Sequence, residues 1–453
     1  MARQSSVSLD ILIVGAGLGG LAAAISCAQA GHHVTICEST KALGEVGAGI
    51  QISPNGSRIL TKFGLYDTLK PKAAEPKFLA IRRFQDGKVL SRTDNFDLEM
   101  RSKYSAPFWE LHRNDLQTAM IDRAIGLGVE VRLNSRVRDI DFDQPAVTLE
   151  NGTVLKADLV VGADGLWSKC RERFLATQGK ADTPIPTGDL AYRIVLNRDE
   201  VTDPELRNWI ANPSVQFWIG PDCHAVAYSL RNGEIFNIVL LVPDNLPASI
   251  SRQRASLDEM RSIFSNWDPV LNRFLDQVKS VDKWKLMNRP ELPNWINEKA
   301  NFVIIGDACH PMLPYIAQGA NTSMEDGAAL GTILSGLESR DELPRAMHLY
   351  QHIRKRRGEA IVREAFRQRD DYHMHDGPEQ VARDERLATK NRTSVIADKE
   401  FPVRWQCPRA QPWIFGYDAF ALTEPTTLDE IRAKGKKAGR PSSGAVDVDY
   451  ARL

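Results

Sequence analysis

The first residues that could do chemistry are glycines with the spacing of a dinucleotide site. Gly15, Gly17 and Gly20 form the pattern G-x-G-x-x-G between the apolar run 9–14 and a helical pattern over 18–30. The first glycine permits a tight turn, the second lets the backbone approach a pyrophosphate, and the third lets strand and helix pack closely. The helix N-terminus then offers free N–H groups to that pyrophosphate. The pattern alone is weak, because a glycine turn that serves only packing has the same letters.

A carboxylate follows at the distance that recognition of a ribose requires. Glu38 comes directly after the apolar run 33–37, about twenty residues beyond the glycines, where its side chain can accept hydrogen bonds from ribose hydroxyls. Its negative charge disfavours a 2′-phosphate. Together the two features predict a bound dinucleotide, and they do not separate FAD from NAD.

Polar residues in three later motifs point to FAD. Arg113 lies in Leu-His-Arg-Asn-Asp-Leu, Asp164 in Val-Val-Gly-Ala-Asp-Gly, and Asp307 in Ile-Ile-Gly-Asp-Ala-Cys-His-Pro, which leads into Ala-Gln-Gly-Ala-Asn. In this order and spacing the motifs resemble the flavoprotein hydroxylases of the para-hydroxybenzoate hydroxylase group, over about residues 8–370. Within that group the chain is most similar to the salicylate hydroxylase and 6-hydroxynicotinate monooxygenase branch, and it resembles the fungal members of that branch.

The resemblance implies a non-covalent FAD and a role for each of these residues. Asp307 is expected to hydrogen-bond the ribityl chain, and Arg113 is expected to lie along the ribityl and the pyrophosphate. The segment 47–50, which contains Ala48 and Gly49, is expected to run past the isoalloxazine. The helix that follows residue 317 would direct its N-terminus at the flavin pyrimidine, which suits the negative charge of reduced flavin. The other residues expected at the cofactor are Asp164, Gly319 and Ala320.

The chemistry that the resemblance implies is aromatic hydroxylation. The sequence shows no second G-x-G-x-x-G after a strand, which fits enzymes whose flavin is reduced during a transient visit by NADH or NADPH. Reduced flavin then takes up O2 as a C4a-hydroperoxide, whose distal oxygen attacks an electron-rich ring, so the protein must place the ring and keep water out. A flavin oxidase or dehydrogenase and a non-catalytic FAD-binding protein are the alternative functions. Dearomatisation, epoxidation and decarboxylative hydroxylation are the alternative reactions.

Two segments of the β-rich middle resemble substrate-side motifs of the same family, Ala-Tyr-Arg at 191–193 and His-Ala-Val-Ala-Tyr at 224–228. Alternation along a strand places His224 and Tyr228 on one face. We expect Arg193 to hold a phenolate or carboxylate through charge-assisted hydrogen bonds. We expect Tyr228 or His224 to take part in proton transfer, and Arg193 and Tyr228 to lie on neighbouring strands. The alternative is structural, with Tyr228 as a sheet aromatic and His224 as a hairpin-end residue.

Two further residues bear on the chemistry. His310 follows the Gly-Asp motif and could act as a base, although the matching position of the family is more often structural. Gln51 stands where some nicotinate-type relatives carry a catalytic histidine, and this difference argues against a hydroxynicotinate substrate.

The elements that position these residues indicate an α/β fold. We expect a Rossmann-like FAD-binding domain of the GR2 type, an inserted β-sheet substrate domain and C-terminal helices. The FAD-binding domain is predicted to comprise residues 8–72, 105–180 and 285–340, and the substrate domain residues 73–104 and 181–284. A long helix over 341–373 and a charged, partly disordered tail over 374–453 should follow. Two aromatic patches of the tail, near Trp405 and at 413–420, are expected to dock on the body.

Composition limits the partners. The chain has 453 residues with 58 Lys plus Arg and 58 Asp plus Glu, and this balance argues against nucleic acid as a partner. The six cysteines are scattered without a CxxC pair, so we expect no metal site and no disulfide framework. The apolar stretch 11–30 is broken by glycines, and residues 1–10 lack a signal-peptide layout. We therefore expect a cytoplasmic monomer or homodimer without a membrane span, acting on a small aromatic substrate.

Overall fold

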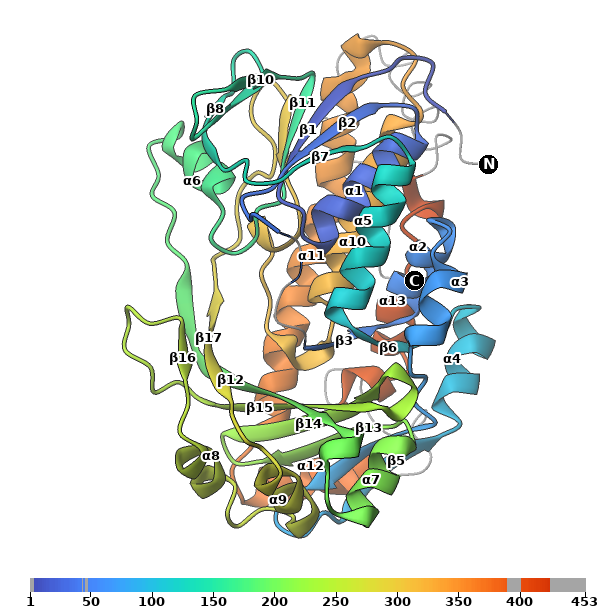
Figure 1. Cartoon of the computed structure of the whole chain (residues 1–453), viewed down its shortest axis with the longest axis vertical. Helices are drawn as coiled ribbons and strands as arrows, with labels where there is room; N and C mark the ends of the chain where they lie inside the picture. Colours follow the sequence, from blue (N-terminus) through green and yellow to red (C-terminus); the bar gives the residue numbers. More distant parts are fainter. Residues whose placement is uncertain (1–3, 43, 45–47, 389–400, 424–453) are drawn as a thin grey trace.

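The computed structural model describes residues 4–42, 44, 48–388 and 401–423. A parallel sheet and a larger, mostly antiparallel sheet occupy opposite ends of the molecule, and the long helix α11 (Leu343–Tyr372) runs from one to the other (Figure 1). The predicted α/β class, with helices at the C-terminal end, is confirmed.

The parallel sheet collects three of the sequence motifs at one edge. Its strands, in spatial order, are β18 (Phe302–Ile304), β11 (Leu159–Gly162), β1 (Asp10–Val14), β2 (His33–Cys37) and β7 (Glu130–Arg132). Every neighbouring pair is parallel. The motif residues Gly15, Asp164 and Gly306 therefore follow the carboxyl ends of adjacent strands, although they lie far apart in the chain.

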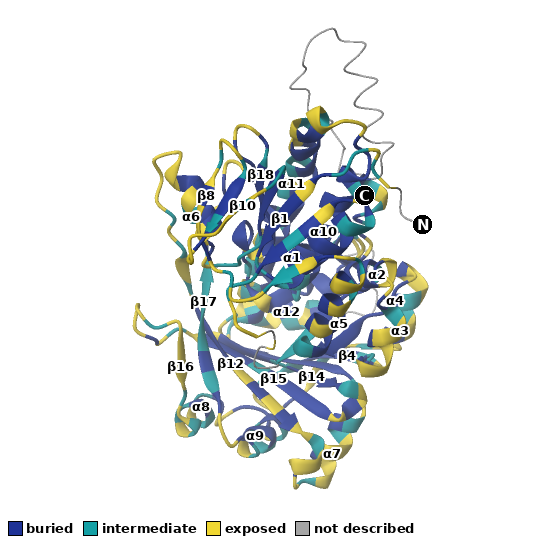
Figure 2. Cartoon of the chain, turned by 45° about the horizontal axis from the view of Figure 1, so that its top comes forward, coloured by how far each residue is buried: buried dark blue, intermediate teal, exposed yellow. Residues whose placement is uncertain are grey.

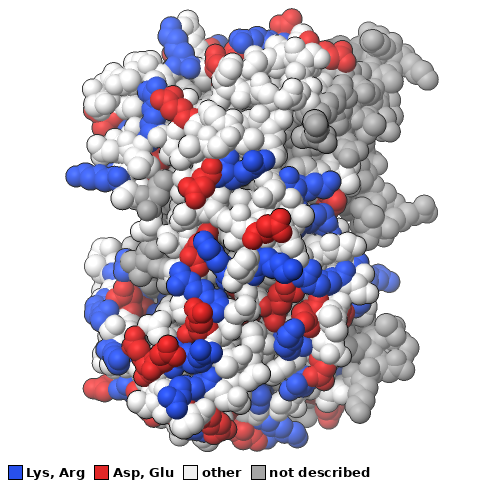
Figure 3. All heavy atoms as spheres, turned by 45° about the vertical axis from the view of Figure 1, so that its right-hand side comes forward, with Lys and Arg blue, Asp and Glu red and all other residues white. Residues whose placement is uncertain are grey.

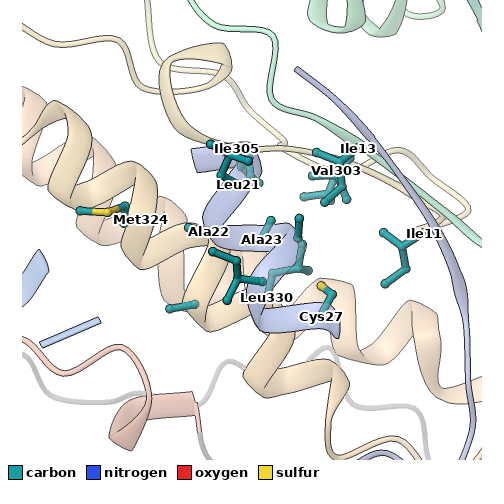
Figure 4. Close-up of a cluster of buried hydrophobic side chains, with 14 of the residues drawn as sticks. Ile11, Ile13, Leu21, Ala22, Ala23, Cys27, Val303, Ile305, Met324 and Leu330 are labelled. Atoms are coloured by element: carbon teal, nitrogen blue, oxygen red, sulfur yellow. The ribbon is translucent and has the colours of Figure 1, made fainter. Parts of the chain in front are cut away.

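Helices and a small sheet cover the two faces of this parallel sheet. The helices on one side are α1 (Leu18–Gln29), α5 (Arg113–Gly126) and α10 (Gly319–Leu334), and the small sheet on the other side consists of β8 (Val137–Asp141), β9 (Ala146–Leu149) and β10 (Val154–Lys156) (Figure 1). Leu21 of α1 and Leu330 of α10 are fully buried in the core that these helices share with the parallel sheet (Figure 4). Burial of a side chain of this size contributes about 1.5–3 kcal/mol.

Two glycines of α10 allow it to approach α1 closely. A Cβ at Gly327 would lie 2.3 Å from the backbone nitrogen of Ala23, and a Cβ at Gly331 would lie 2.3 Å from the Ser26 hydroxyl oxygen. The small side chains of Ala22 and Ala23 leave room on α1 for the close approach of α10 (Figure 4). This contact matters for the site because both helices begin at the cavity described below.

The eight-stranded sheet has two different faces. Its strands, in spatial order, are β16 (Arg252–Arg254), β17 (Asp282–Asn288), β12 (Ile185–Asn197), β15 (Ile235–Pro243), β14 (Cys223–Leu230), β13 (Val215–Gly220), β4 (Phe78–Arg83) and β5 (Val89–Asp94). The outer face packs on α7 (Pro204–Ala211), α8 (Leu257–Ile263) and α9 (Pro269–Asp276). The inner face is turned toward the parallel sheet and is largely buried (Figure 2). Most of its buried residues are apolar.

A two-stranded ribbon and three helices fill the side of the molecule between the sheets. The ribbon pairs β3 (Gly49–Ile52) with β6 (Trp109–His112), and the helices are α2 (Pro54–Lys62), α3 (Tyr66–Leu69) and α4 (Phe96–Tyr104). β6 leads directly into α5 and thereby places Arg113 at the start of that helix.

The C-terminal part packs on the body, as the aromatic patches predict. Residues 378–388 form α12 (Pro378–Ala388), and 410–415 form α13 (Ala410–Phe415). Trp405 and Phe415 are buried and contact Phe108 with ring centroids 5.2 and 6.0 Å away. The sequence predicts a partly disordered tail over 374–453, of which residues 389–400 and 424–453 lie outside the described residues.

The surface carries mixed charges. On the face drawn in Figure 3, basic and acidic side chains alternate rather than gather by sign. Within the described ranges, no helix has the length and apolar character needed to cross a membrane.

Candidate active site

A cavity of about 620 Å3 lies between the carboxyl edge of the parallel sheet and the inner face of the eight-stranded sheet. This volume falls within the usual range for ligand sites of about 300–1,000 Å3. Of the described residues that the sequence places at FAD or at the substrate, all except Gly20 and the candidate base His310 line it. They are Gly15, Gly17, Glu38, Ala48, Gly49, Arg113, Asp164, Arg193, His224, Tyr228, Asp307, Gly319 and Ala320. Gly47, which was predicted beside the flavin, lies outside the described residues.

The glycine turn has the geometry that a pyrophosphate needs. Gly15 has φ +107°, and a Cβ there would lie 2.5 Å from the carbonyl oxygen of Ala163. A Cβ at Gly20 would lie 2.1 Å from the carbonyl oxygen of Gly15, so this glycine serves the packing of helix on strand. A Cβ at Gly17 would meet no described atom within 4 Å. Gly17 is also the N-cap of α1 without a described side-chain cap, so the cavity faces free N–H groups.

Glu38 is held as a carboxylate at the end of β2. Its oxygens accept hydrogen bonds from the backbone N–H groups of Ala16 and Thr40, both at 2.8 Å. Burial alone would raise the pKa of Glu38, but these hydrogen bonds outweigh burial and lower that pKa. An ionised carboxylate beside the glycine turn suits the hydroxyls of a ribose.

Asp164 holds the loop after β11 in place. Its Oδ1 accepts a hydrogen bond from the Ser168 hydroxyl at 2.5 Å, and its Oδ2 accepts one from the backbone N–H of Cys170 at 3.0 Å. Both donors lie at the start of α6 (Lys169–Ala176). Asp164 therefore shapes the rim of the cavity as a turn residue as well as lining it.

Asp307 lies deep in the molecule and yet is exposed, because its side chain faces the cavity. Burial raises the pKa of Asp307, while the positive charges of His310 and Arg113 act against that rise. Arg113 lines the same cavity, so a carboxylate and a guanidinium both face the space between the glycine turn and α10. A polar chain with hydroxyl and phosphate groups fits these two charges.

The start of α10 offers a second helix N-terminus. Gly319 and Ala320 form its first turn and line the cavity, and no described side chain caps the helix at Gln318. The positive end of the helix dipole favours negative charge on a ligand at this position. The open glycine turn, the two charged side chains and two uncapped helices together fit FAD.

His310 is part of a buried network and does not line the cavity. Its Nε2 lies 2.5 Å from Oδ2 of Asp326, and Oδ1 of Asp326 accepts a hydrogen bond from Arg354 at 2.8 Å. Burial lowers the pKa of His310, but its electrostatic interactions with Cys309 and Asp326 outweigh burial and raise that pKa well above its ordinary value. Its contact with Asp326, away from the cavity lining, favours the structural interpretation of His310, which stays a prediction.

The substrate-side residues share the inner face of the eight-stranded sheet. Arg193 of β12 pairs with Val239 of β15, which pairs with Val226 of β14. Strand β15 therefore separates β12 from β14, and the prediction that Arg193 and Tyr228 lie on neighbouring strands is wrong. Both side chains nevertheless line the same cavity, since side chains of the three strands alternate toward one face.

Tyr228 packs against the ribbon strand beside the cofactor residues. A Cβ at Gly49 would lie 2.6 Å from the Tyr228 ring, and the backbone N–H of Gly49 donates to Oδ1 of Asn237 at 2.8 Å. Burial and the charge of Glu110 raise the pKa of Tyr228, while Arg193 acts against this rise. Tyr228 therefore remains a neutral phenol that can donate a hydrogen bond.

His224 lies at the other end of the same strand face. About 13 Å separates it from Tyr228, at the usual rise per strand residue. The His224 ring lies 4.8 Å from the ring of Tyr315, which also lines the cavity. Burial, with a smaller effect of His373, lowers the pKa of His224 well below its ordinary value, so His224 is a neutral imidazole at neutral pH.

The cavity between His224 and Tyr228 is lined by apolar residues that were not predicted as site residues. They are Ala191, Phe217, Val226, Val239, Leu241, Leu286, Met312, Leu313 and Trp405. Strand alternation could have identified those next to Arg193 and His224, but no local signal places Trp405 at the cavity. Gln51 lines the cavity too, and its side-chain amide donates to Glu110 at 3.2 Å.

Comparisons with known proteins agree with this geometry. The family model described as FAD binding domain matches residues 8–365. The FAD-dependent monooxygenase OpS4 of Beauveria bassiana (strain ARSEF 2860) is 49% identical over 92% of this chain and 96% of its own length. The 6-hydroxynicotinate 3-monooxygenase of Bordetella bronchiseptica is 32% identical over 78% of this chain and 89% of its own.

A solved structure shows the same fold. The salicylate hydroxylase substrate complex superposes with a TM-score of 0.74 at 20% identity, covering 92% of this chain and 97% of that one. The predicted likeness to the salicylate hydroxylase and 6-hydroxynicotinate monooxygenase branch is confirmed. With the family match over most of its length and a cavity built for FAD, the chain belongs to the FAD-binding-domain family and is an FAD-dependent monooxygenase.

Proposed function

We propose that the enzyme hydroxylates a phenolic or related electron-rich aromatic compound, with NADH or NADPH as reductant and O2 as oxidant. The observation that carries the proposal is one continuous cavity, in which the FAD residues face an apolar sheet surface bounded by Arg193, Tyr228 and His224. Such a space holds a flat ring against the cofactor and excludes water from the reaction. Relatives of the chain are named for hydroxynicotinate and hydroxybenzoate, which are aromatic compounds.

The chain's own residues orient and activate the ring. FAD, once reduced and supplied with O2, provides the electrophilic oxygen. Val226 and Val239 form an apolar floor between the polar groups. Arg193 stabilises negative charge on the ring oxygen, Tyr228 donates a hydrogen bond that positions the ring, and the neutral His224 accepts the hydroxyl proton.

The proposal also covers the electron donor, the location of the protein in the cell and its oligomeric state. We propose NADH as the preferred donor, a cytoplasmic location and a monomer or homodimer. Glu38 faces the predicted position of the FAD ribose, so its charge does not select between the nicotinamides. Stopped-flow reduction of the flavin by each nicotinamide decides this choice, and a clear preference for NADPH would contradict it.

The reaction is tested with a panel of phenols, phenolic acids and indoles under 18O2. We expect FAD-loaded enzyme to oxidise the nicotinamide faster with a matching compound and to place one labelled oxygen atom in the product. A product without label, or peroxide as the sole fate of O2 with every compound, would instead indicate a flavin oxidase or dehydrogenase.

A further inference from the structure

We propose that His224 and His373 form a proton relay that joins the substrate end of the cavity to solvent. The proposal rests on the proposed hydroxylation and adds the route by which a phenol loses its proton. His224 Nδ1 and His373 Nε2 lie 2.8 Å apart, within hydrogen-bond distance. His373 follows the part of the chain that the family model matches, residues 8–365, so the family pattern assigns it no role.

The pair spans the wall between the cavity and the surface. His224 is 1% exposed and lines the cavity. With Nδ1 directed at His373, its Nε2 is the ring nitrogen left for a ligand. His373 directly follows α11 and is partly exposed. Its carbonyl oxygen accepts a hydrogen bond from the backbone N–H of Asp222 at 3.2 Å, which ties the end of α11 to the turn between β13 and β14.

Both rings are neutral near pH 7. Burial lowers the pKa of His373 to about 3, with a further contribution from Arg369, and burial also dominates at His224. A pair of neutral imidazoles shares one N–H in the hydrogen bond, so one ring donates while the other accepts. A proton can then enter at one end of the pair as another leaves at the far end.

The groups around the pair leave His224 without a carboxylate partner among the described residues. Its ring faces Tyr315 at 4.8 Å and Tyr372 at 5.3 Å. The nearby carboxylate of Asp189 accepts a hydrogen bond from the Tyr315 hydroxyl at 2.8 Å and lies 3.7 Å from Arg369. Asp189 is thus engaged elsewhere, and His373 is the group to which His224 can pass a proton.

The relay step conserves every proton. The substrate O–H bond breaks and an N–H bond forms at Nε2 of His224. The Nδ1–H bond of His224 breaks as an N–H bond forms at Nε2 of His373, and Nδ1 of His373 releases its proton to water. Each ring gains one proton as it loses another, so both rings stay neutral across the transfer. Reprotonation of the product oxygen along the reverse path restores both rings.

The test follows ionisation of a bound phenol without turnover. The probe is 4-nitrophenol, because its phenolate absorbs visible light that the neutral form does not. It is mixed with oxidised, FAD-loaded enzyme in a stopped-flow instrument, at a pH below its solution pKa. We expect wild type to form the phenolate on binding, and His373→Gln to slow its appearance by about 10²-fold, the lower end of general acid–base effects. The Kd of His373→Gln for the probe is measured by quenching of flavin fluorescence. It should stay within about threefold of the wild-type Kd, since a tenfold change would correspond to about 1.4 kcal/mol.

Two further variants separate the relay from a structural effect. His375→Gln removes an exposed histidine that lies 2.9 Å from Asp222, and it should leave the rate unchanged. His373→Ala should be slow, and imidazole added to the solution should restore its rate. Equal rates in the His373→Gln and His375→Gln variants, or binding of the probe by wild type only as the neutral phenol, would overturn the relay. These measurements need no O2, so a failure of hydroxylation would not obscure them.

Discussion

Asp307 is the residue whose loss should be felt most directly in cofactor binding. Its carboxylate faces the cavity between the glycine turn and α10. We expect Asp307→Ala to weaken FAD binding by about 10- to 150-fold, because a hydrogen bond to a charged group contributes about 1.5–3 kcal/mol. The measurement is the FAD content and Kd of purified protein. Asp199→Ala, which removes a 95% exposed side chain, is the control, and full yellow occupancy in Asp307→Ala would disprove the role.

Arg193 and Tyr228 should act on the reaction and not on the cofactor. Arg193→Ala and Tyr228→Phe are expected to keep FAD and to lower hydroxylated product by about 10²–10⁴-fold. NADH oxidation can continue in these variants with release of peroxide, because flavin reduction and O2 uptake do not require these side chains. The measurement is the ratio of product to NADH consumed. Wild-type ratios and rates in both variants would show that the two residues serve only the scaffold.

The sequence indicated the roles of some site residues and not of others. Gly15, Gly17 and Glu38 could be identified because one short strand–turn–helix pattern contains all of them. His310 could not be interpreted from its neighbours in the chain, because its charge depends on Asp326 across the fold. Tyr228 was identified by likeness to a motif, but its contact with Gly49 arises from two separate sheets.

At the scale of elements, the contact between α1 and α10 positions two helix N-termini at the cavity. We expect Gly331→Ala to lower the free energy of unfolding, because a Cβ there would lie 2.3 Å from the Ser26 hydroxyl oxygen. Overpacking of this kind costs about 1–3 kcal/mol. The effect should appear in the melting temperature of both FAD-loaded and FAD-free protein.

Gly126→Ala is the matched control for the helix contact. Gly126 ends α5, and a Cβ there would meet no described atom within 4 Å. Alanine in place of a helical glycine stabilises a protein by about 0.5–1 kcal/mol, so this variant should melt at an equal or higher temperature than wild type. If Gly331→Ala and Gly126→Ala change the melting temperature alike, close packing of α1 against α10 does not depend on a glycine at position 331.

At the scale of the whole molecule, a segment from the far end of the chain completes the cavity. Trp405 lines it and donates its indole N–H to the carbonyl oxygen of Ile316 at 3.1 Å. We expect Trp405→Phe to improve binding of 2-phenylphenol relative to phenol by about tenfold, a difference of about 1.4 kcal/mol, because the smaller ring leaves room for a larger substrate. Flavin-fluorescence titration with both phenols measures this ratio.

Trp413→Phe is the control for this wall. Trp413 belongs to the same C-terminal segment and lies 5.2 Å from the Arg357 guanidinium, away from the cavity lining. Its replacement should leave the ratio of the two phenol affinities unchanged. An unchanged ratio in Trp405→Phe as well would mean that the segment contributes to stability and not to specificity.

The proposed division into an FAD-binding and a substrate domain stays a prediction.

The glycine turn and its carboxylate Glu38 were determined by local sequence pattern, and the arrangement of the substrate-side strands by tertiary structure. A strand, a glycine turn, a helix and a carboxylate follow one another within about thirty residues, so their geometry depends on short-range rules. The order of β12, β15 and β14 depends on pairing between distant segments, which leaves no mark on any one of them. For the same reason only the folded chain brings His373 to His224, and Trp405 to the wall of the cavity.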